Sequence, residues 1–312
     1  MQNIQTARGA RSKVRHRIRL STGDRVYLGV VYAFLILFVL IVLYPLLYVV
    51  SCSFSSPEAL VSGRVFFLPV EPGLQGYKAV FQNPQVWSGY YNSIIYTVSG
   101  TLVSTAVTMV GGYVLSRREF KMRGVLTALF TFTMFFNGGT MPTYLLIKNL
   151  HMLDTIWAII LPGAFSVWLG VIARTYIQSN IPEELYESAC LDGGDYFQHF
   201  LRIVLPLSKP ILAVLALNFA TGHWNSYFSA MIYLSDPDKF PLQIILRNIL
   251  IQNTVDFTSI SSMDVTNLVE KQYLAELLKY SLIIISSIPL LIVYPFIQKY
   301  FIKGIMVGSI KG

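Results

Sequence analysis

The chain has 312 residues, of which 54% are hydrophobic and only 13% are charged. Soluble domains carry about 25% charged residues, so this composition excludes an ordinary soluble domain and indicates a polytopic membrane protein. The net charge of +8 also suits a nucleic-acid binder, but the positions of the basic residues fit a membrane better, and we expect no nucleic-acid partner.

The first predicted element is an apolar helix over residues 28–50, after a basic tail over residues 1–27. A basic segment before an apolar run can be a cleavable signal, and Val49-Val50-Ser51-Cys52 matches the local pattern of a lipoprotein cleavage site. The run is about 23 residues long, which exceeds a signal core and suits a complete span. We therefore predict that this helix is retained.

Six apolar runs in the sequence are long enough to cross a bilayer. They cover residues 28–50, 92–115, 125–147, 156–177, 211–234 and 277–297. Barrel strands would alternate polar and apolar residues over shorter segments, so helices are expected. The predicted fold class is an all-α polytopic membrane protein, with a six-helix transmembrane domain over residues 28–300 and a short tail over residues 301–312.

The basic residues predict the orientation of these helices. Seven of the 24 Lys and Arg residues precede the first span, and four more follow the second span. The positive-inside rule then places both termini and the polar segment 182–210 in the cytoplasm. Residues 51–91 and 235–276 become outer loops, which either connect helices or form a packed rim that receives a component from outside.

This orientation also determines whether the two cysteines can form a disulfide bond. Cys52 and Cys190 fall on opposite sides of the membrane, which excludes a disulfide between them. No Cys/His spacing resembles a metal site, so no bound metal is expected.

The third apolar run is interrupted near its middle by Phe-Asn-Gly-Gly-Thr-Met-Pro over residues 136–142. Gly138 and Gly139 free the backbone, and Pro142 removes one hydrogen bond and disfavours helix at the residue before it. Broken helices near the midplane are common at transporter binding sites, so Asn137 is a candidate for the substrate pathway. The alternative is a simple kink that neighbouring helices relieve.

The polar segment 182–210 separates the fourth and fifth runs and begins with a predicted short helix. Pro182 suits a first helical turn, where a missing N–H has no cost. Glu183, Glu184 and Glu187 follow in the half of a helix where the macrodipole favours negative charge.

Gly193 and Gly194 can end this first helix through a left-handed residue. Asp195 is then a suitable N-cap for a second short helix, which Pro206 and Pro210 would end. The apolar face predicted for this second helix comprises Phe197, Phe200, Leu201, Val204 and Leu205. The segment therefore predicts a helix–turn–helix that lies across the membrane surface, either as a docking surface for a soluble partner or as an ordinary interfacial loop.

Polar and aromatic residues gather in the fifth run within about three helical turns. They are Asn218, Thr221, His223, Trp224, Asn225 and Tyr227. Aromatic faces stack on sugar C–H surfaces and amides or hydroxyls bind sugar rims, so Asn218, Trp224, Asn225 and Tyr227 are candidates for the substrate pathway. Trp168, near the middle of the fourth run, is a further candidate. The competing interpretation is that Trp224 and Tyr227 belong to the outer aromatic belt, and His223 is expected to be a hydrogen-bonding residue.

The polar segment resembles the EAA loop of ATP-binding cassette (ABC) import permeases. The resemblance rests on Glu187-Ser188-Ala189, on Asp192-Gly193, and on Ile203 followed by Leu205-Pro206. Two small residues depart from the pattern, since Ser188 and Gly194 stand where Ala is common. The resemblance implies a type I importer fold and a coupling helix that seats in a groove of a cytoplasmic ATPase subunit. The residues it assigns to coupling are Glu187, Ser188, Ala189, Asp192, Gly193, Gly194, Leu205 and Pro206.

A wider resemblance extends from the first span to the C-terminus. Residues 138–150, 153–164 and 223–228 are similar to the oligosaccharide-importing branch of these permeases. The resemblance implies a bacterial cytoplasmic membrane protein that carries a carbohydrate. It also implies a second homologous permease chain, two ATPase subunits that bind ATP and Mg, and an extracytoplasmic solute-binding protein. A permease for a non-sugar solute is the alternative within this class.

Absent motifs bear on the rival functions. The sequence contains no G-x-x-x-x-G-K-[ST] loop, so this chain is not expected to bind or hydrolyse ATP. The spans contain no chain of Asp or Glu residues of the kind used in proton relays, which weakens an ion-coupled secondary transporter. A membrane-embedded enzyme would need convergent titratable groups, yet the four histidines are scattered. We therefore expect no cofactor and no enzymatic activity in this chain.

Overall fold

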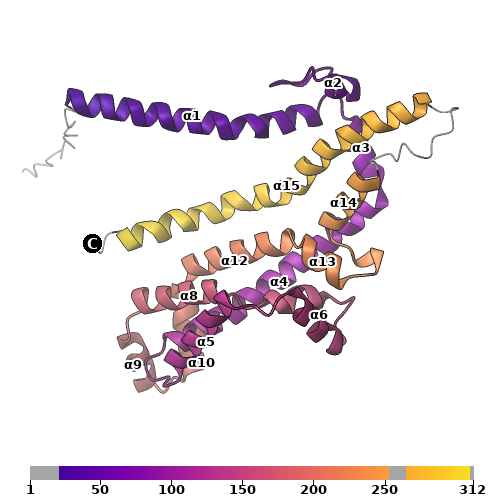
Figure 1. Cartoon of the computed structure of the whole chain (residues 1–312). Coiled ribbons are helices and arrows are strands. Elements are labelled where there is room, and N and C mark those ends of the chain that lie inside the picture. The colour runs from indigo at the N-terminus through magenta and orange to yellow at the C-terminus, as the bar shows by residue number, and fades with distance from the viewer. Residues whose placement is uncertain (1–20, 253–264, 310–312) are drawn as a thin grey trace, which may run out of the picture. The chain divides into compact units, whose positions relative to one another are not determined.

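The computed structural model describes residues 21–252 and 265–309 (Figure 1). These residues divide into two units, one ending at Tyr48 and the other beginning at Val49, and each is described by itself. Most of the predicted basic tail, residues 253–264 of the second outer loop and residues 310–312 lie outside the described residues.

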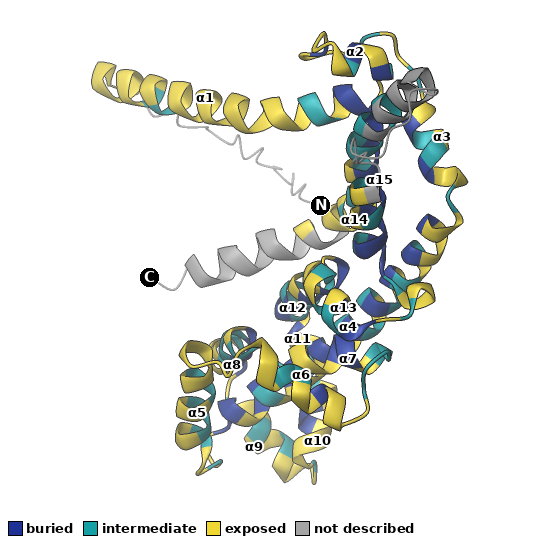
Figure 2. Cartoon of the chain, turned by 45° about the vertical axis from the view of Figure 1, so that its right-hand side comes forward, coloured by how far each residue is buried: buried dark blue, intermediate teal, exposed yellow. Residues whose placement is uncertain are grey.

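The first unit consists of helix α1 (Thr22–Ser53) as far as Tyr48. The apolar side chains from Phe34 to Leu43 are all exposed (Figure 2). An exposed apolar surface of this length is expected where the surroundings are lipid or another chain. The predicted first span, residues 28–50, lies within α1.

The second unit contains the remaining helices, and the described residues contain no strand. In chain order these helices are α2 (Pro57–Val61), α3 (Gln75–Gln82), α4 (Pro84–Ser116), α5 (Arg123–Phe135), α6 (Thr140–Asn149), α7 (Ile156–Ile160), α8 (Val167–Asn180), α9 (Glu184–Leu191), α10 (Tyr196–His199), α11 (Leu205–Leu207), α12 (Lys209–Trp224), α13 (Tyr227–Tyr233), α14 (Leu242–Gln252) and α15 (Val265–Ser309). The 3-10 segments η1 (Leu161–Gly163) and η3 (Pro237–Lys239) and the π-helical segment η2 (Phe200–Val204) complete the unit. The all-α prediction is confirmed for these residues.

Three helical segments in the described chain are long and apolar enough to cross a membrane, namely α1, α4 and residues 276–295 of α15. Two bent pairs raise this number to five if each pair is one span. The first pair joins α7 and η1 to α8 at 54°, and the second joins the helical stretch 196–207 to α12 at 83°. The remaining predicted run, residues 125–147, forms the two short helices α5 and α6.

The predicted interruption of the third run is confirmed. α5 ends at Phe135 and α6 begins at Thr140, with four residues between them. Gly139 has φ +88°, a conformation that favours glycine. The Asn137 carboxamide oxygen accepts a hydrogen bond from the Gly139 N–H at 2.8 Å, which fixes the turn locally.

The hydropathy pattern predicts one straight helix for the fourth run and one for the fifth. In the structure both runs are broken into two helices. Pro162 in η1 cannot donate a backbone hydrogen bond, and Ser166 starts α8 anew by accepting from the Leu169 N–H at 3.4 Å. α12 ends at Trp224 with Asn225 as its C-cap, and α13 begins at Tyr227.

Helix α4 runs through the second unit, and most of the core packs against it (Figure 1). Glycines allow two close approaches. A Cβ on Gly100 would lie 2.7 Å from the His223 ring of α12, and one on Gly112 would lie 2.8 Å from Ala173 of α8. His223 itself lies 3.2 Å from the Ser104 hydroxyl, so the hydrogen-bonding role predicted for it is confirmed.

The two loops predicted to lie outside contain packed structure in the described residues. Val65 is buried, and the Ser51 hydroxyl donates to the Phe67 carbonyl at 2.7 Å. In the second loop, Asn92 of α4 donates to the carbonyls of Asp238 at 2.7 Å and Phe240 at 3.1 Å. These contacts favour a shaped rim over simple connections.

Candidate coupling site

The first helix of the polar segment is α9, which ends before Gly193 as predicted but begins only at Glu184, so Pro182 precedes the helix and is not in its first turn. Glu183 lies at its N-cap position and Asp192 at its C-cap position. Glu187 and Ser188 are exposed, whereas Ala189 is half-buried. Leu191 is 89% exposed, which is unusual for a leucine and marks this end of α9 as an open surface.

The turn after α9 is formed by two glycines with different constraints. Gly193 has φ +78° and open space around its missing side chain, so its need for glycine is purely conformational. The Gly194 N–H donates to the Ala189 carbonyl at 2.7 Å. A Cβ on Gly194 would lie 2.8 Å from that carbonyl oxygen, so alanine does not fit here without a shift. This turn therefore requires glycine at position 194, although Ala is common there in the EAA pattern.

The second helix begins as predicted, because the Asp195 carboxylate accepts from the Gln198 N–H at 2.7 Å. Its predicted apolar face is only partly correct. Phe200 and Val204 are buried in the core, whereas Phe197 is 66% exposed and Leu201 is 43% exposed. The cause is the π-helical segment η2, which changes the rotation per residue and so separates side chains expected on one face.

Pro206 does not end this helix as predicted. It lies in the first turn of α11, directly after η2, and the larger change of direction comes before α12. Leu205 packs against the core while Pro206 is exposed. Leu205 therefore supports the segment from the core side, whereas Pro206 lies on its exposed surface.

A groove of about 340 Å³ lies between α9 and the second helix. Of the predicted coupling residues, Ser188, Ala189, Asp192 and Gly194 line it. Glu187 and Gly193 do not line the groove, and they lie on the exposed surface beside it.

Arg117, the residue after α4, joins the end of that helix to the start of α9. Its guanidinium pairs with Glu183 and lies 3.3 Å from Glu119. It also lies 3.9 Å from the ring centroid of Tyr186, close enough for a cation–π interaction. Arg117 is only 8% exposed, so these contacts are shielded from solvent.

Tyr113, one turn earlier on α4, contacts the second helix. Its hydroxyl lies 2.9 Å from Nδ1 of His199 and donates to the Tyr196 carbonyl at 3.2 Å. His199 is 2% exposed, and burial lowers its pKa, with the nearby Arg117 acting in the same direction and Glu183 opposing it. The end of α4 therefore holds both helices of the segment.

Sequence reasoning missed these connecting residues. In the sequence Arg117 is one of the four basic residues that follow the second span, and His199 is one of four scattered histidines. The partners of Arg117 lie 66 and 69 positions away along the chain, and no local pattern indicates such a contact.

The candidates for the substrate pathway divide into exposed and buried residues. The candidates Asn218 and Asn225 are exposed, and so is Thr221 between them; their spacing of i, i+3 and i+7 places the three on one face of α12 and its C-cap. Each side chain donates to the carbonyl four residues earlier, at 2.9, 2.8 and 3.0 Å. In the described chain this polar face is open.

Trp224 lies elsewhere. It is 3% exposed, its indole N–H donates to the Ser286 carbonyl of α15 at 3.0 Å, and its ring lies 6.1 Å from that of Tyr90. The structure thus shows it packed between helices, without the open ring face that we expected for sugar stacking. The ring of Tyr227 is approached by the Arg247 guanidinium at 5.6 Å.

Asn137 and Trp168 are both exposed, Trp168 to 62%. Asn137 lies between α5 and α6, and Trp168 lies in the first turn of α8. Among the described residues, no hydrogen bond or aromatic ring contact joins either of them to the polar face of α12.

An all-α chain with several apolar helices and a helix–turn–helix held at one end of α4 has the transmembrane fold of type I ABC importers. The chain belongs to the family of binding-protein-dependent transport system inner membrane components, which it matches over residues 16–307.

Similar proteins agree with this membership. The polygalacturonan/rhamnogalacturonan transport system permease protein YtcP of Bacillus subtilis (strain 168) is 38% identical over 93% of this chain and 99% of its own length. Protein LplC of the same strain is 40% identical over 87% of this chain and 90% of its own length. In a crystal structure of a bacterial ABC transporter involved in the import of the acidic polysaccharide alginate, one chain matches with TM-score 0.80 and 34% identity, over 90% of this chain and 99% of that one.

Proposed function

We propose that this chain is one transmembrane subunit of an ATP-driven importer in the bacterial cytoplasmic membrane, and that its cargo is an oligosaccharide. YtcP and the alginate importer, whose names specify polysaccharides, support the cargo. Membership among the inner membrane components of binding-protein-dependent transport supports the mechanism. A permease for a non-sugar solute is the alternative within this class.

The observation that carries the coupling role is the contrast between the two ends of α9. The N-terminal turn of α9 is held by Arg117 through Glu183 and Tyr186. The C-terminal end of α9 is open, because Leu191 is 89% exposed. A short helix that is fixed behind and free in front can pass a rigid-body movement to the helix that holds it. The proposed contacts to a cytoplasmic ATPase subunit are made or supported by Glu187, Ser188, Ala189, Asp192, Gly193, Gly194, Leu205 and Pro206.

The open polar face of α12 supports a partner on the membrane side. Asn218, Thr221 and Asn225 are exposed in the single chain, and polar groups in a bilayer normally face a pathway or another helix. A second, homologous permease chain would complete the pathway. Two ATPase subunits would bind ATP and Mg in the cytoplasm, where both termini of this chain would also lie, and an extracytoplasmic protein would deliver the sugar.

A basic groove beside the proposed pathway supports an acidic oligosaccharide as the cargo. Tyr227, Arg247 and Lys279 line this groove, which has a volume of about 400 Å³. Lys279 is paired with Glu276 at 2.5 Å, but none of the ion pairs in the described chain involves Arg247. Its charge is therefore available to a carboxylate on a uronic acid.

The test is transport by the purified complex in sealed vesicles. We expect uptake of galacturonate oligomers to require ATP, the ATPase subunits and the solute-binding protein together. Uptake driven by an ion gradient without ATPase subunits would contradict the proposed mechanism. Uptake of neutral and acidic oligomers with equal efficiency, in both the wild type and Arg247→Gln, would contradict the acidic cargo alone.

A further inference from the structure

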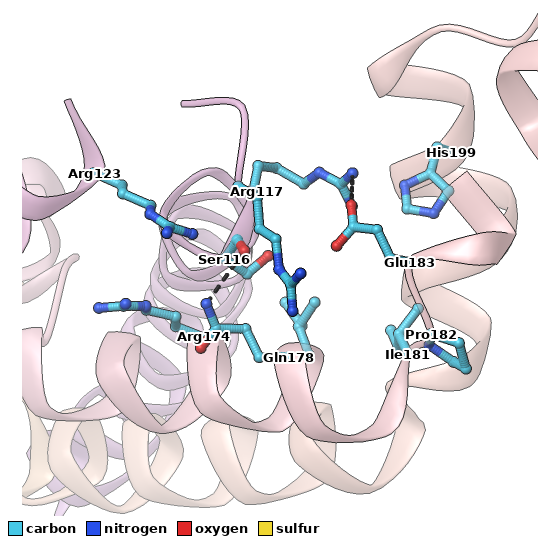
Figure 3. A pocket seen from close by; sticks show the side chains of 11 residues that line it. Ser116, Arg117, Arg123, Arg174, Gln178, Ile181, Pro182, Glu183 and His199 are labelled. Atoms are coloured by element: carbon cyan, nitrogen blue, oxygen red, sulfur yellow. Dashed lines mark hydrogen bonds and ion pairs between the residues drawn. The ribbon is translucent and has the colours of Figure 1, made fainter. Parts of the chain in front are cut away.

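A cavity of about 550 Å³ lies where the ends of α4 and α8, the start of α5 and the first residues of the polar segment meet (Figure 3). Four arginines line it, namely Arg117, Arg118, Arg123 and Arg174. Glu183 is the only carboxylate among the lining residues. The coupling role proposed above uses Arg117 and Glu183 but leaves the other three arginines unexplained.

The three remaining arginines have no anionic partner in the described chain. Arg117 is matched by Glu183 and Glu119, and Figure 3 shows its pair with Glu183 on one side of the cavity. Arg123 and Arg174 lie on the other side. None of the ion pairs among the described residues involves Arg118, Arg123 or Arg174.

Three buried nitrogens on residues that line the cavity also lack hydrogen-bond partners, and one of them is Nε of Arg117. Nη1 of Arg174 donates to the Thr127 hydroxyl at 3.1 Å, but its Nε is buried without a hydrogen bond. His199 is 2% exposed and its Nε2 has no partner. Buried polar groups in proteins are normally satisfied, so these atoms indicate a missing acceptor or donor group at this place.

The level of the cavity in the membrane limits which anions can reach it. Arg174 lies within the fourth apolar run, three residues before its predicted end, and Ser116 is the last residue of α4. With the cytoplasmic orientation proposed above, the cavity lies at the level of the lipid headgroups. Basic pockets between helices on the cytoplasmic side are typical binding places for anionic headgroups.

We propose that this cavity binds a phosphate group, carried by an anionic phospholipid of the inner leaflet. Arginine presents planar donors that match phosphate oxygens in a bidentate manner, and Arg123 and Arg174 approach the cavity from two different helices. A headgroup there would join α5 and α8 beside the residues that hold α9. Free phosphate offers the same oxygens, so the experiment must separate the two sources.

The experiment measures lipid retention by the purified complex, with native mass spectrometry after exchange into detergent with phosphatidylglycerol or phosphatidylcholine. We expect the wild type to retain phosphatidylglycerol in preference, and the double variant Arg123→Gln/Arg174→Gln to lose this preference by roughly tenfold or more, because charge-assisted hydrogen bonds are removed. Lys121→Gln is the matched control, since Lys121 is an exposed charge on the loop between α4 and α5 and does not line the cavity. The variant Arg123→Lys/Arg174→Lys should retain part of the preference.

A second arm adds inorganic phosphate to lipid-depleted complex and measures the melting temperature. If phosphate raises the melting temperature but the wild type shows no preference between the two lipids, the cavity binds a soluble phosphate and the phospholipid part of the proposal is contradicted. Equal retention of both lipids by the wild type, together with no stabilisation by phosphate, would overturn the proposal. Co-purification of the ATPase subunits, measured on the same samples, reports separately on the proposed function and on whether the variants fold.

Discussion

The guanidinium of Arg117 lies 3.9 Å from the ring centroid of Tyr186 and pairs at the same time with Glu183. One side chain at the end of α4 thus contacts both the N-cap and the middle of α9. The contact is enclosed, because the Arg117 side chain is only 10% exposed. A displacement of α9 must therefore either move the end of α4 or break this contact.

Replacing Arg117 by Gln should reduce transport strongly while the protein still inserts into the membrane. The change removes a hydrogen-bonded charge and leaves Glu183 without its partner, which costs about 1–3 kcal/mol of stability. Arg117→Lys should recover only part of the transport, since lysine lacks the planar stacking surface. The measurement is ATP-dependent uptake alongside ATPase activity of the complex. Glu119→Gln serves as the control, because Glu119 is the more exposed partner and its loss should matter little.

The two glycines of the turn should respond differently to substitution. At Gly193, Asn should be tolerated and Val should not, because only φ matters there and Asn adopts the left-handed region more readily. At Gly194, even Ala should destabilise the turn, since its Cβ would meet the Ala189 carbonyl. Co-purification of the ATPase subunits and the melting temperature would measure both effects. A Gly194→Ala variant as stable as the wild type would contradict the described packing.

Glu187→Lys should abolish uptake without changing stability beyond about 0.5 kcal/mol. Glu187 is exposed and takes part in none of the ion pairs among the described residues, so its loss removes no ion pair from that part of the chain. The effect should appear as loss of ATPase subunits from the purified complex. Normal uptake by this variant would exclude Glu187 from the coupling contact.

Variants of Trp224 and Asn218 should distinguish a loss of stability from a change in transport. Trp224→Ala should destabilise the protein by about 3–5 kcal/mol, because it empties a buried site. Asn218→Ala should leave the melting temperature almost unchanged but alter the uptake rate, since its amide is exposed on the polar face of α12. Thermal unfolding in detergent and uptake kinetics would be measured for both variants. If the Trp224→Ala protein is as stable as the wild type but has an altered sugar preference, Trp224 contacts the substrate and its role is not packing.

Acid should weaken the contact between α4 and the second helix through His199. Burial holds the pKa of His199 below its ordinary value of 6.5, so the unfolded state binds a proton first as the pH falls. The free energy of unfolding should therefore decrease as the pH falls from about 7 to about 5. His199→Gln cannot titrate and should show a smaller decrease over the same range. Identical pH profiles for the two proteins would rule out this contribution.

Local features of the polar segment were predictable from the sequence. Gly193 supplies a left-handed turn and Asp195 caps the next helix, and both effects depend only on neighbouring residues. The break between α5 and α6 was predictable for the same reason, because adjacent glycines and a proline act on their own backbone.

Features that depend on distant contacts were not predictable. The burial of Trp224 requires α15 to lie beside α12. The contacts of Arg117 with Glu183 and Tyr186 require α9 to lie beside the end of α4. The π-helical segment η2 changes which of Phe197 and Phe200 faces the core, and its sequence carries no marker for this. Hydropathy also reports the length of an apolar run but not the bend at Pro162.

The close approach of Gly100 to His223 has a mechanical consequence. A hypothetical Cβ on Gly100 would lie 2.7 Å from the imidazole, so the His223 side chain of α12 packs directly against the backbone of α4, and the two helices cannot slide past each other here without separating. Helix α4, which ends directly before Arg117, and helix α12, which carries Asn218, must then move together. Under the function proposed above, a displacement of α9 that moves the end of α4 would therefore also move the exposed amide of Asn218 on α12.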